Sequence, residues 1–234
     1  MKLLKQNDFI FTKHPHKNGL SGQKLWATRN ADGKRFVVKH EEALHVSNEF
    51  VFYSMAKALG LHTPEVYLFE VDLSRKLFKS GCAIAIEYIE SERYLEWPNE
   101  NSGIHNWKDF YTYRALRGVV YQDDGVEILL SKDGYMYSID WAEAFEANTD
   151  MIYRFINSIF RECQEKATAK DWEDIFVDTL LDWVELPKEK IIEVLDDLRE
   201  VFPQETIDFY LDFLRRSQGV CKYFLKEKFG GEAE

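Results

Sequence analysis

The sequence predicts an α+β fold of two lobes, a β-rich lobe over residues 1–90 and a mostly helical lobe over residues 91–234. Short apolar runs separated by turn-forming residues fill the first part, which is typical of strands joined by tight turns. From Asn148 almost to the end, apolar residues recur at the spacing of amphipathic helices. The composition changes between Glu90 and Pro98, and we interpret this change as the lobe boundary.

The β-rich lobe is predicted to consist of strands around a single helix. Asp32-Gly33 lies between two strand-like runs and predicts a tight hairpin turn. Helical periodicity runs from Val46 to Leu59, with Ser47 or Asn48 as the expected N-cap. A nearly continuous apolar run at residues 82–89 indicates a central strand. The other strands are expected at residues 9–12, 24–29 and 35–40 and after Pro64.

The second lobe is predicted to hold one β-hairpin among helices. The hairpin covers residues 126–140 and turns at Asp133-Gly134. Pro187 suits the first turn of a helix, where its missing N–H costs nothing. Helices are expected at residues 106–121, 171–184, 187–202 and 204–229.

Composition excludes several classes of protein. The chain has 234 residues, is 45% hydrophobic and carries a net charge of -11, so we expect a folded core and no non-specific binding to nucleic acid or anionic membrane. No run approaches the roughly 20 apolar residues of a membrane-spanning helix, and the first residues do not resemble a signal peptide. Three widely spaced cysteines suggest reduced thiols, so we expect a cytoplasmic protein.

Lys39 and Glu49 are the first candidate functional pair. Lys39 ends a predicted strand, and Glu49 lies near the start of the following helix. A lysine held by a neighbouring glutamate offers a fixed positive charge to nucleotide phosphates, as in protein kinases. The alternative is an edge-strand lysine and a solvated glutamate without a shared role.

The segment Asn18 to Trp26 is a candidate phosphate-binding loop. Its glycines, Gly19 and Gly22, allow close approach of the backbone, and successive amides, including that of Ser21, could form an anion-binding nest. The segment is neither a Walker A loop nor a full glycine fingerprint, so a plain β-turn is the alternative.

Carboxylates flank the predicted hairpin of the second lobe. Asp140 ends its last strand, where it could bind Mg²⁺ or instead cap a following helical turn. Asp123, Asp124 and Glu127 precede the hairpin. They are a solvated acidic turn or, alternatively, a general base and a second metal ligand.

The order of these parts resembles the HipA-like kinases, which have a protein-kinase-like fold. The resemblance covers roughly residues 19–145, and "MAKALGLHTPE" at residues 55–65 is its most specific motif. The segments "LSGQK", "IEYIE" and "SIDWAEAF" match in the same order.

The resemblance implies an ATP- and Mg²⁺-dependent serine/threonine protein kinase. Lys39 would contact the ATP phosphates, Glu49 would hold Lys39, and Asp140 would bind Mg²⁺. Ser21 would be a candidate autophosphorylation site. The phosphate loop would include Gly19, Ser21 and Gly22, and the adenine-binding hinge would include Glu87, Tyr88 and Ile89.

The chain departs from the family in the catalytic segment. The family reads Asp-Arg-His-x-x-Asn; if Glu127 takes the place of the metal-binding asparagine, Gln122 falls at the catalytic base. Asp123 or Asp124, shifted by one or two positions, would then have to act as the base. A nucleotide-binding pseudokinase that regulates a partner protein and a small-molecule kinase are therefore the alternatives to a kinase acting on a protein substrate.

Overall fold

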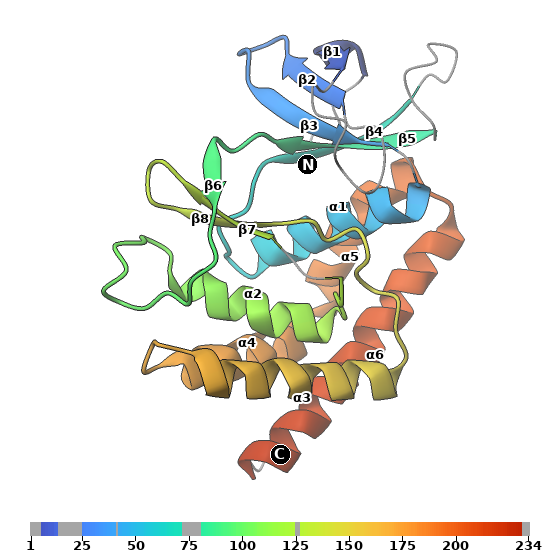
Figure 1. Cartoon of the computed structure of the whole chain (residues 1–234). Coiled ribbons are helices and arrows are strands. Elements are labelled where there is room, and N and C mark those ends of the chain that lie inside the picture. The colour runs from blue at the N-terminus through green and yellow to red at the C-terminus, as the bar shows by residue number, and fades with distance from the viewer. Residues whose placement is uncertain (1–5, 14–24, 41, 72–80, 125–126, 231–234) are drawn as a thin grey trace.

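The computed structural model describes residues 6–13, 25–40, 42–71, 81–124 and 127–230. Figure 1 shows a sheet at one end of the molecule, a layer of helices at the other, and a small second sheet beside them. The predicted α+β composition, strands first and helices after, is confirmed.

The N-terminal sheet is antiparallel throughout, with the strand order β1-β2-β3-β5-β4. Because side chains alternate along a strand, β3 buries Phe36 and Val38 in a cluster on the outer face and turns Lys39 to the other face. Lys39 is opposite Ile84 of β5, which belongs to the core that α1 shares. The strands are β1 (Phe9–Lys13), β2 (Leu25–Arg29), β3 (Arg35–Lys39), β4 (Val66–Glu70) and β5 (Cys82–Glu87).

Helix α1 (Ala43–Ala58) packs against β4 and β5 and also against the helical part of the chain. It begins before Ser47 and Asn48, so the predicted N-cap at these residues is wrong, and Glu42 precedes the helix instead. Ser47 and Asn48 are fully buried, and their polar groups are satisfied by tertiary contacts. The Tyr210 hydroxyl donates to Asn48 Oδ1 at 2.6 Å and lies 2.7 Å from Ser47 Oγ.

The helical part is built on the same core as α1. One cluster of buried side chains runs from Val46 on α1 to Phe224 on α6. Gly118 lets α2 approach α3 closely, because a Cβ there would lie 3.1 Å from the Cα of Ile156. The predicted helix at 187–202 is shorter and continues as a 3₁₀ turn over Asp197–Glu200. The helices are α2 (Lys108–Val119), α3 (Thr149–Lys166), α4 (Trp172–Glu185), α5 (Lys188–Asp196) and α6 (Gln204–Phe229).

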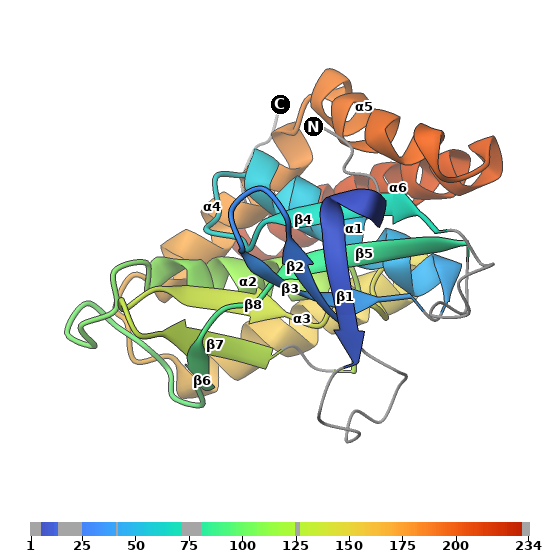
Figure 2. The same cartoon turned by 90° about the horizontal axis from the view of Figure 1, so that it is seen from above.

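A second antiparallel sheet, in the order β6-β7-β8, contains the predicted hairpin. Strands β7 (Glu127–Ser131) and β8 (Met136–Ile139) are joined by a turn with Gly134 at φ +82°. Strand β6 (Ser91–Arg93) pairs with β7 and was not predicted, since its short polar sequence has no apolar alternation. In the view from above, β8 lies beside α2, and the N-terminal sheet lies over α1 (Figure 2).

The division at residue 90 stays a prediction. Helix α1 is part of the first lobe by sequence, yet its buried face shares one core with the helices. In the described residues, no helix combines the length and the apolar character that crossing a bilayer requires.

We expect Tyr210→Phe to destabilise the protein by about 1–3 kcal/mol, because it leaves the buried Asn48 Oδ1 without its donor. Urea unfolding monitored by circular dichroism measures this difference. Tyr223→Phe is the matched control, since Tyr223 lies on the same helix with 61% of its surface exposed. Equal unfolding midpoints for the two variants would show that the hydroxyl does not hold α1 to α6.

Candidate active site

Three elements that are distant in sequence meet at the ammonium group of Lys39. Lys39 Nζ, at the end of β3, contacts Glu49 Oε1 on α1 and lies 2.8 Å from Asp140 Oδ1, directly after β8. The Glu49 side chain is 0% exposed, whereas that of Asp140 is 51% exposed. The structure thus brings together the three residues that the sequence singled out for phosphate and metal binding, and their roles in binding stay predictions.

Both carboxylates act on the charge of Lys39. Burial alone would lower the pKa of this lysine, but Glu49 and Asp140 overcome that effect and raise it. Lys39 is therefore a fixed cation at any physiological pH. The buried Tyr53, one turn along α1 from Glu49, has a pKa well above its usual value because of its burial and the nearby Glu49 charge. Glu49 Oε2 has no hydrogen-bond partner among the described residues, although it is buried.

Asp140 is held in an unusual backbone conformation. Its φ of +72° lies in the left-handed region, which costs a non-glycine residue about 1–3 kcal/mol and persists only where the surroundings impose it. One such restraint is Gln122, whose Nε2 donates to the Asp140 carbonyl oxygen at 2.9 Å.

The residues after Asp140 are bound to α1. The Trp141 ring stacks on Phe52 at 3.4 Å between centroids and 10° between planes, and the Ala142 carbonyl accepts from Asn48 Nδ2 at 2.7 Å. Sequence reasoning did not identify Asn48, Phe52 or Trp141 as contributors to the site. The available signal was a tryptophan directly after the candidate metal-binding aspartate, since a large aromatic residue there needs a buried partner.

Gln122, at the expected place of the catalytic base, is structural. It is 1% exposed, and an amide cannot accept a proton at neutral pH. Arg117 holds the same segment by donating to the carbonyls of Gln122 and Asp123 at 2.7 and 3.2 Å. Asp123 and Asp124 follow as exposed side chains on this tethered segment.

Glu127 forms an ion pair on the second sheet. Its Oε1 lies 3.8 Å from Arg93 Nη1 on β6, an ion pair between two exposed side chains. Glu127 is paired with Ile139, the residue before Asp140, so the two candidate metal ligands start from adjacent backbone positions. Their joint role in binding Mg²⁺ stays a prediction.

The side chains of the predicted hinge are engaged with the sheet. Glu87 forms an ion pair with Lys34 at 2.8 Å, and the Tyr88 N–H donates to the Arg35 carbonyl at 2.9 Å. The Tyr88 ring lies 4.7 Å from that of Trp26, on β2. An adenine base bound at this hinge would therefore have to hydrogen-bond to other main-chain groups, those of Ile89 among them. Gly19, Ser21 and Gly22 of the predicted phosphate loop lie outside the described residues.

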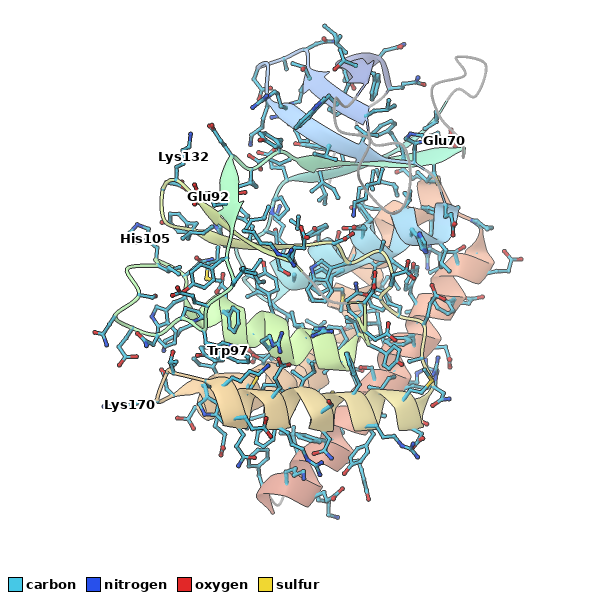
Figure 3. All side chains as sticks on the ribbon, in the orientation of Figure 1. Glu70, Glu92, Trp97, His105, Lys132 and Lys170 are labelled. Carbon is cyan, nitrogen blue, oxygen red and sulfur yellow. The ribbon has the colours of Figure 1, made fainter. Side chains whose placement is uncertain are left out.

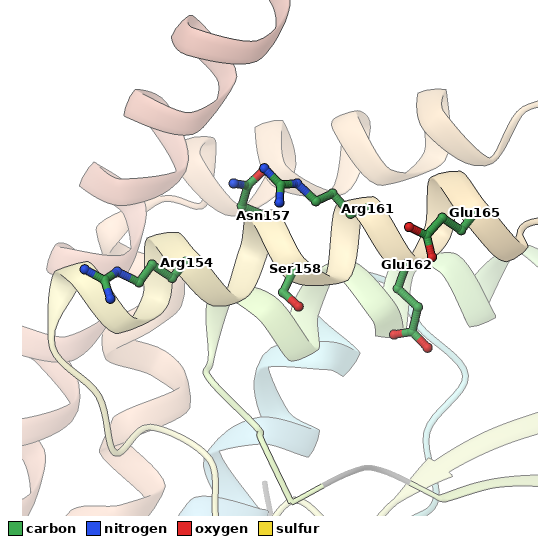
Figure 4. Close-up of a pocket in the computed structure, with 6 residues that line it drawn as sticks. All are labelled: Arg154, Asn157, Ser158, Arg161, Glu162 and Glu165. Carbon is green, nitrogen blue, oxygen red and sulfur yellow. The ribbon is translucent and has the colours of Figure 1, made fainter.

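A second polar region lies on α3, which Figure 1 places on the side of α2 away from the β7–β8 hairpin. It is a depression of about 530 Å³ along one helix face (Figure 4). Glu162, one of its acidic side chains, is already paired with Arg114 and Lys166. The lining of this depression comes from a single helix, whereas Lys39, Glu49 and Asp140 come together from three elements. Its lining residues are Arg154, Asn157, Ser158, Arg161, Glu162 and Glu165.

Comparison with known proteins identifies the fold. No protein-family model and no curated protein sequence matches the chain. Among solved structures it is similar to the proinflammatory kinase CtkA of Helicobacter pylori, with a TM-score of 0.55, 13% identity, and coverage of 93% of this chain and 96% of that one. A match in the Neurospora crassa complex of PAN2 with the PAN3 pseudokinase has 11% identity and covers 99% of this chain and 60% of that one. Its TM-score of 0.30 is too low to support a conclusion.

The chain has a protein-kinase-like fold, with a β-sheet lobe followed by a helical lobe. The predicted fold class is thereby confirmed. The similarity to CtkA covers nearly all of both chains, so it extends to the helical part, where the sequence resemblance carried no motif.

The burial of the two partners of Lys39 predicts unequal contributions to stability. We expect Glu49→Gln to lower the free energy of unfolding by about 1.5–3 kcal/mol, because it removes a buried charge-assisted contact. Asp140→Asn should cost less than about 1 kcal/mol, because half of that side chain is exposed. Urea unfolding of the two variants measures the difference. A cost for Asp140→Asn equal to that for Glu49→Gln would contradict the assignment of Glu49 as the structural partner.

Proposed function

We propose that the protein is an ATP- and Mg²⁺-dependent phosphotransferase of the HipA-like type that acts on serine or threonine of a protein. The single observation that supports it best is the position of Lys39, a permanent cation held between Glu49 on α1 and Asp140 after β8. Phosphoryl transfer depends mostly on such positioning, since little covalent chemistry is left to the protein.

The residues present fit a nucleotide and a hard cation. Lys39 would bind phosphate oxygens, and the half-exposed Asp140 carboxylate would be an oxygen ligand for Mg²⁺, which prefers one or two carboxylates together with phosphates. Mg²⁺ supplies charge neutralisation on the phosphates when it is bound. Glu49 then holds the Lys39 ammonium in position, because separating the pair would leave the buried Glu49 carboxylate without a counter-charge, at a large desolvation cost.

The aromatic rings of Trp26 and Tyr88 are suited to bind the adenine base of ATP. Trp26 is opposite Val37 in the sheet, two residues before Lys39, so it projects from the same sheet face as Lys39. Its ring meets Tyr88 edge to face. Aromatic rings at this position can stack on a nucleobase. The acceptor is assigned to protein on the sequence resemblance alone, and a small-molecule acceptor is the alternative.

A second candidate function, a nucleotide-binding pseudokinase that regulates a partner protein, is favoured by Gln122. The residue at the place of the base is a buried amide that binds the Asp140 backbone. Loss of a general base reduces a rate by roughly 10²–10⁴-fold. The phosphate-binding residues are unaffected by that loss, so nucleotide binding would persist.

We expect Mg-ATP to raise the melting temperature of the wild-type protein, and Lys39→Met to weaken ATP binding roughly ten- to hundredfold, because it removes a charge-assisted phosphate contact. Titration calorimetry measures the affinity. Lys132→Met is the matched control, since Lys132 lies at the exposed turn of the β7–β8 hairpin and pairs with Glu90 (Figure 3). Equal affinities of both variants and the wild type would exclude Lys39 from the nucleotide site.

The two candidates differ in turnover. If the protein is an active kinase, Asp123→Asn or Asp124→Asn should lower kcat by about 10²–10⁴-fold and leave ATP binding unchanged. Phosphoryl transfer from labelled ATP to a panel of proteins measures this rate, with Asp182→Asn, at an exposed position on α4, as the control. ATP binding by the wild type without any transfer would favour the pseudokinase. Transfer that neither Asp123→Asn nor Asp124→Asn slows would remove both aspartates as the base.

A further inference from the structure

A cluster of potential metal ligands lies where α1 meets the segment after β8, next to the candidate active site. His45 on the first turn of α1 and Glu143 and Glu146 offer ligand atoms that all lie within 4.8 Å of one another. His45 Nε2 is 3.4 Å from Glu143 Oε1 and 3.7 Å from Glu42 Oε2. A single imidazole nitrogen thus lies within 4 Å of two carboxylates, in a protein of net charge -11.

The two backbones that carry these side chains are fixed by buried contacts. His45, Asn48 and Phe52 lie on one face of α1. Along this face His45 lies beside Glu143, Asn48 donates to the Ala142 carbonyl, and Phe52 stacks on Trp141. The spacing between His45 and Glu143 is therefore set by a hydrogen bond and a ring stack further along the same seam, the line of contact between α1 and residues 141–143.

Glu146 is fixed in a similar way. It follows Phe145, a fully buried residue with φ +72°, whose ring packs edge to face against Tyr210 and Phe213. The backbone that carries Glu146 is thereby tied to α6. Fixed backbones reduce the entropy that side chains lose on binding an ion.

We propose that His45, Glu143 and Glu146 form a binding site for a divalent first-row transition metal, with Zn²⁺ as the best match. One imidazole nitrogen and two carboxylate oxygens are a donor set that zinc accepts, with water in the remaining position. Mg²⁺ prefers oxygen ligands in a near-octahedral arrangement, so it is a poor match for the imidazole. The side chains of His45 and Glu143 are 27% and 45% exposed, which leaves the site open to ions from solvent.

The bound metal links α1 to the segment that follows Asp140. His45 is one turn from Glu49 on α1, and Glu143 is three residues beyond Asp140. A metal bridge across this seam stabilises the arrangement in which Glu49 and Asp140 both contact Lys39. The further suggestion that zinc occupancy tunes phosphoryl transfer rests on the proposed function, whereas the metal site itself does not.

The test is calorimetric titration of Zn²⁺ into metal-free, untagged full-length protein, with melting temperatures measured in parallel. We expect one zinc per chain and a higher melting temperature. His45→Gln, and separately the double variant Glu143→Gln/Glu146→Gln, should each weaken binding by about tenfold or more, since even outer-shell partners of a metal contribute roughly 10–100-fold. Two variants on different elements keep the test decisive if one of them folds poorly.

Two controls separate this site from others in the chain. His14→Gln/His16→Gln removes the two closely spaced histidines near the start of the chain, and His105→Gln removes an exposed histidine before α2; both should bind zinc as the wild type does. Absence of zinc binding by the wild type overturns the proposal, as does binding that survives in His45→Gln or is lost in either control. Mg-ATP stabilisation, measured on the same samples without zinc, reports on the proposed function separately.

Discussion

The geometry of the molecule depends on one ammonium group shared between two carboxylates that come from different elements. Glu49 is fully buried, so without Lys39 it would be an uncompensated charge in the core, at a cost of several kcal/mol. Lys39 therefore ties α1 to the sheet by charge as well as by packing. Asp140 is the exposed partner of the same ammonium, and it depends on Gln122 and on its own left-handed backbone for its position. The Lys39 ammonium thus has one buried partner, Glu49, and one that is accessible to solvent, Asp140.

Helix α1 connects this charge pair to the rest of the chain. Its buried residues belong to the core cluster of the helical part, whereas the outer face of the sheet has a separate cluster around Phe36. The helix also buries Ser47 and Asn48, which are poor choices for a helix interior unless their polar groups find partners. Tyr210 and the Ala142 carbonyl are those partners, so the network specifies how α1 sits relative to both α6 and the segment after β8. The position of α1 relative to α6 and to the segment after β8 is thus set by hydrogen bonds as well as by packing.

The sequence predicted those features that depend on local pattern. The Asp32-Gly33 hairpin, the apolar strand β5, the β7–β8 turn and the helical end follow from turn chemistry and periodicity, and the structure contains each. Contacts between residues that are distant in sequence could not be predicted unless a motif implied them. Asn48 was interpreted as a cap because its partners are 94 and 162 residues away, and nothing local identifies such partners. The three-residue strand β6 was not predicted, because its pairing with β7 defines it and its own short sequence carries no strand pattern. Lys39, Glu49 and Asp140 were singled out from their positions at the ends of predicted strands and near the start of a helix, and the resemblance then supplied the long-range information that they act at one site.

Under the proposed function, an amide at Gln122 in place of the expected base would affect the chemistry less than it affects the resemblance to HipA-like kinases. Correct positioning of reactants is worth effective molarities of about 10⁵–10⁸ M, whereas a general base is worth roughly 10²–10⁴-fold. In a loose phosphoryl-transfer transition state the charge is spread over the phosphate oxygens, and catalysis is mostly positioning and stabilisation of that charge. Under the proposed function Lys39 and Asp140 are the groups that would act on those charges, and the structure places the two side chains in contact. Gln122 contributes to that arrangement by donating to the Asp140 carbonyl, a role that an ionised carboxylate could not fill because it has no hydrogen to donate. If neither Asp123 nor Asp124 serves as the base, the proposed kinase lacks the smaller contribution and keeps the larger one.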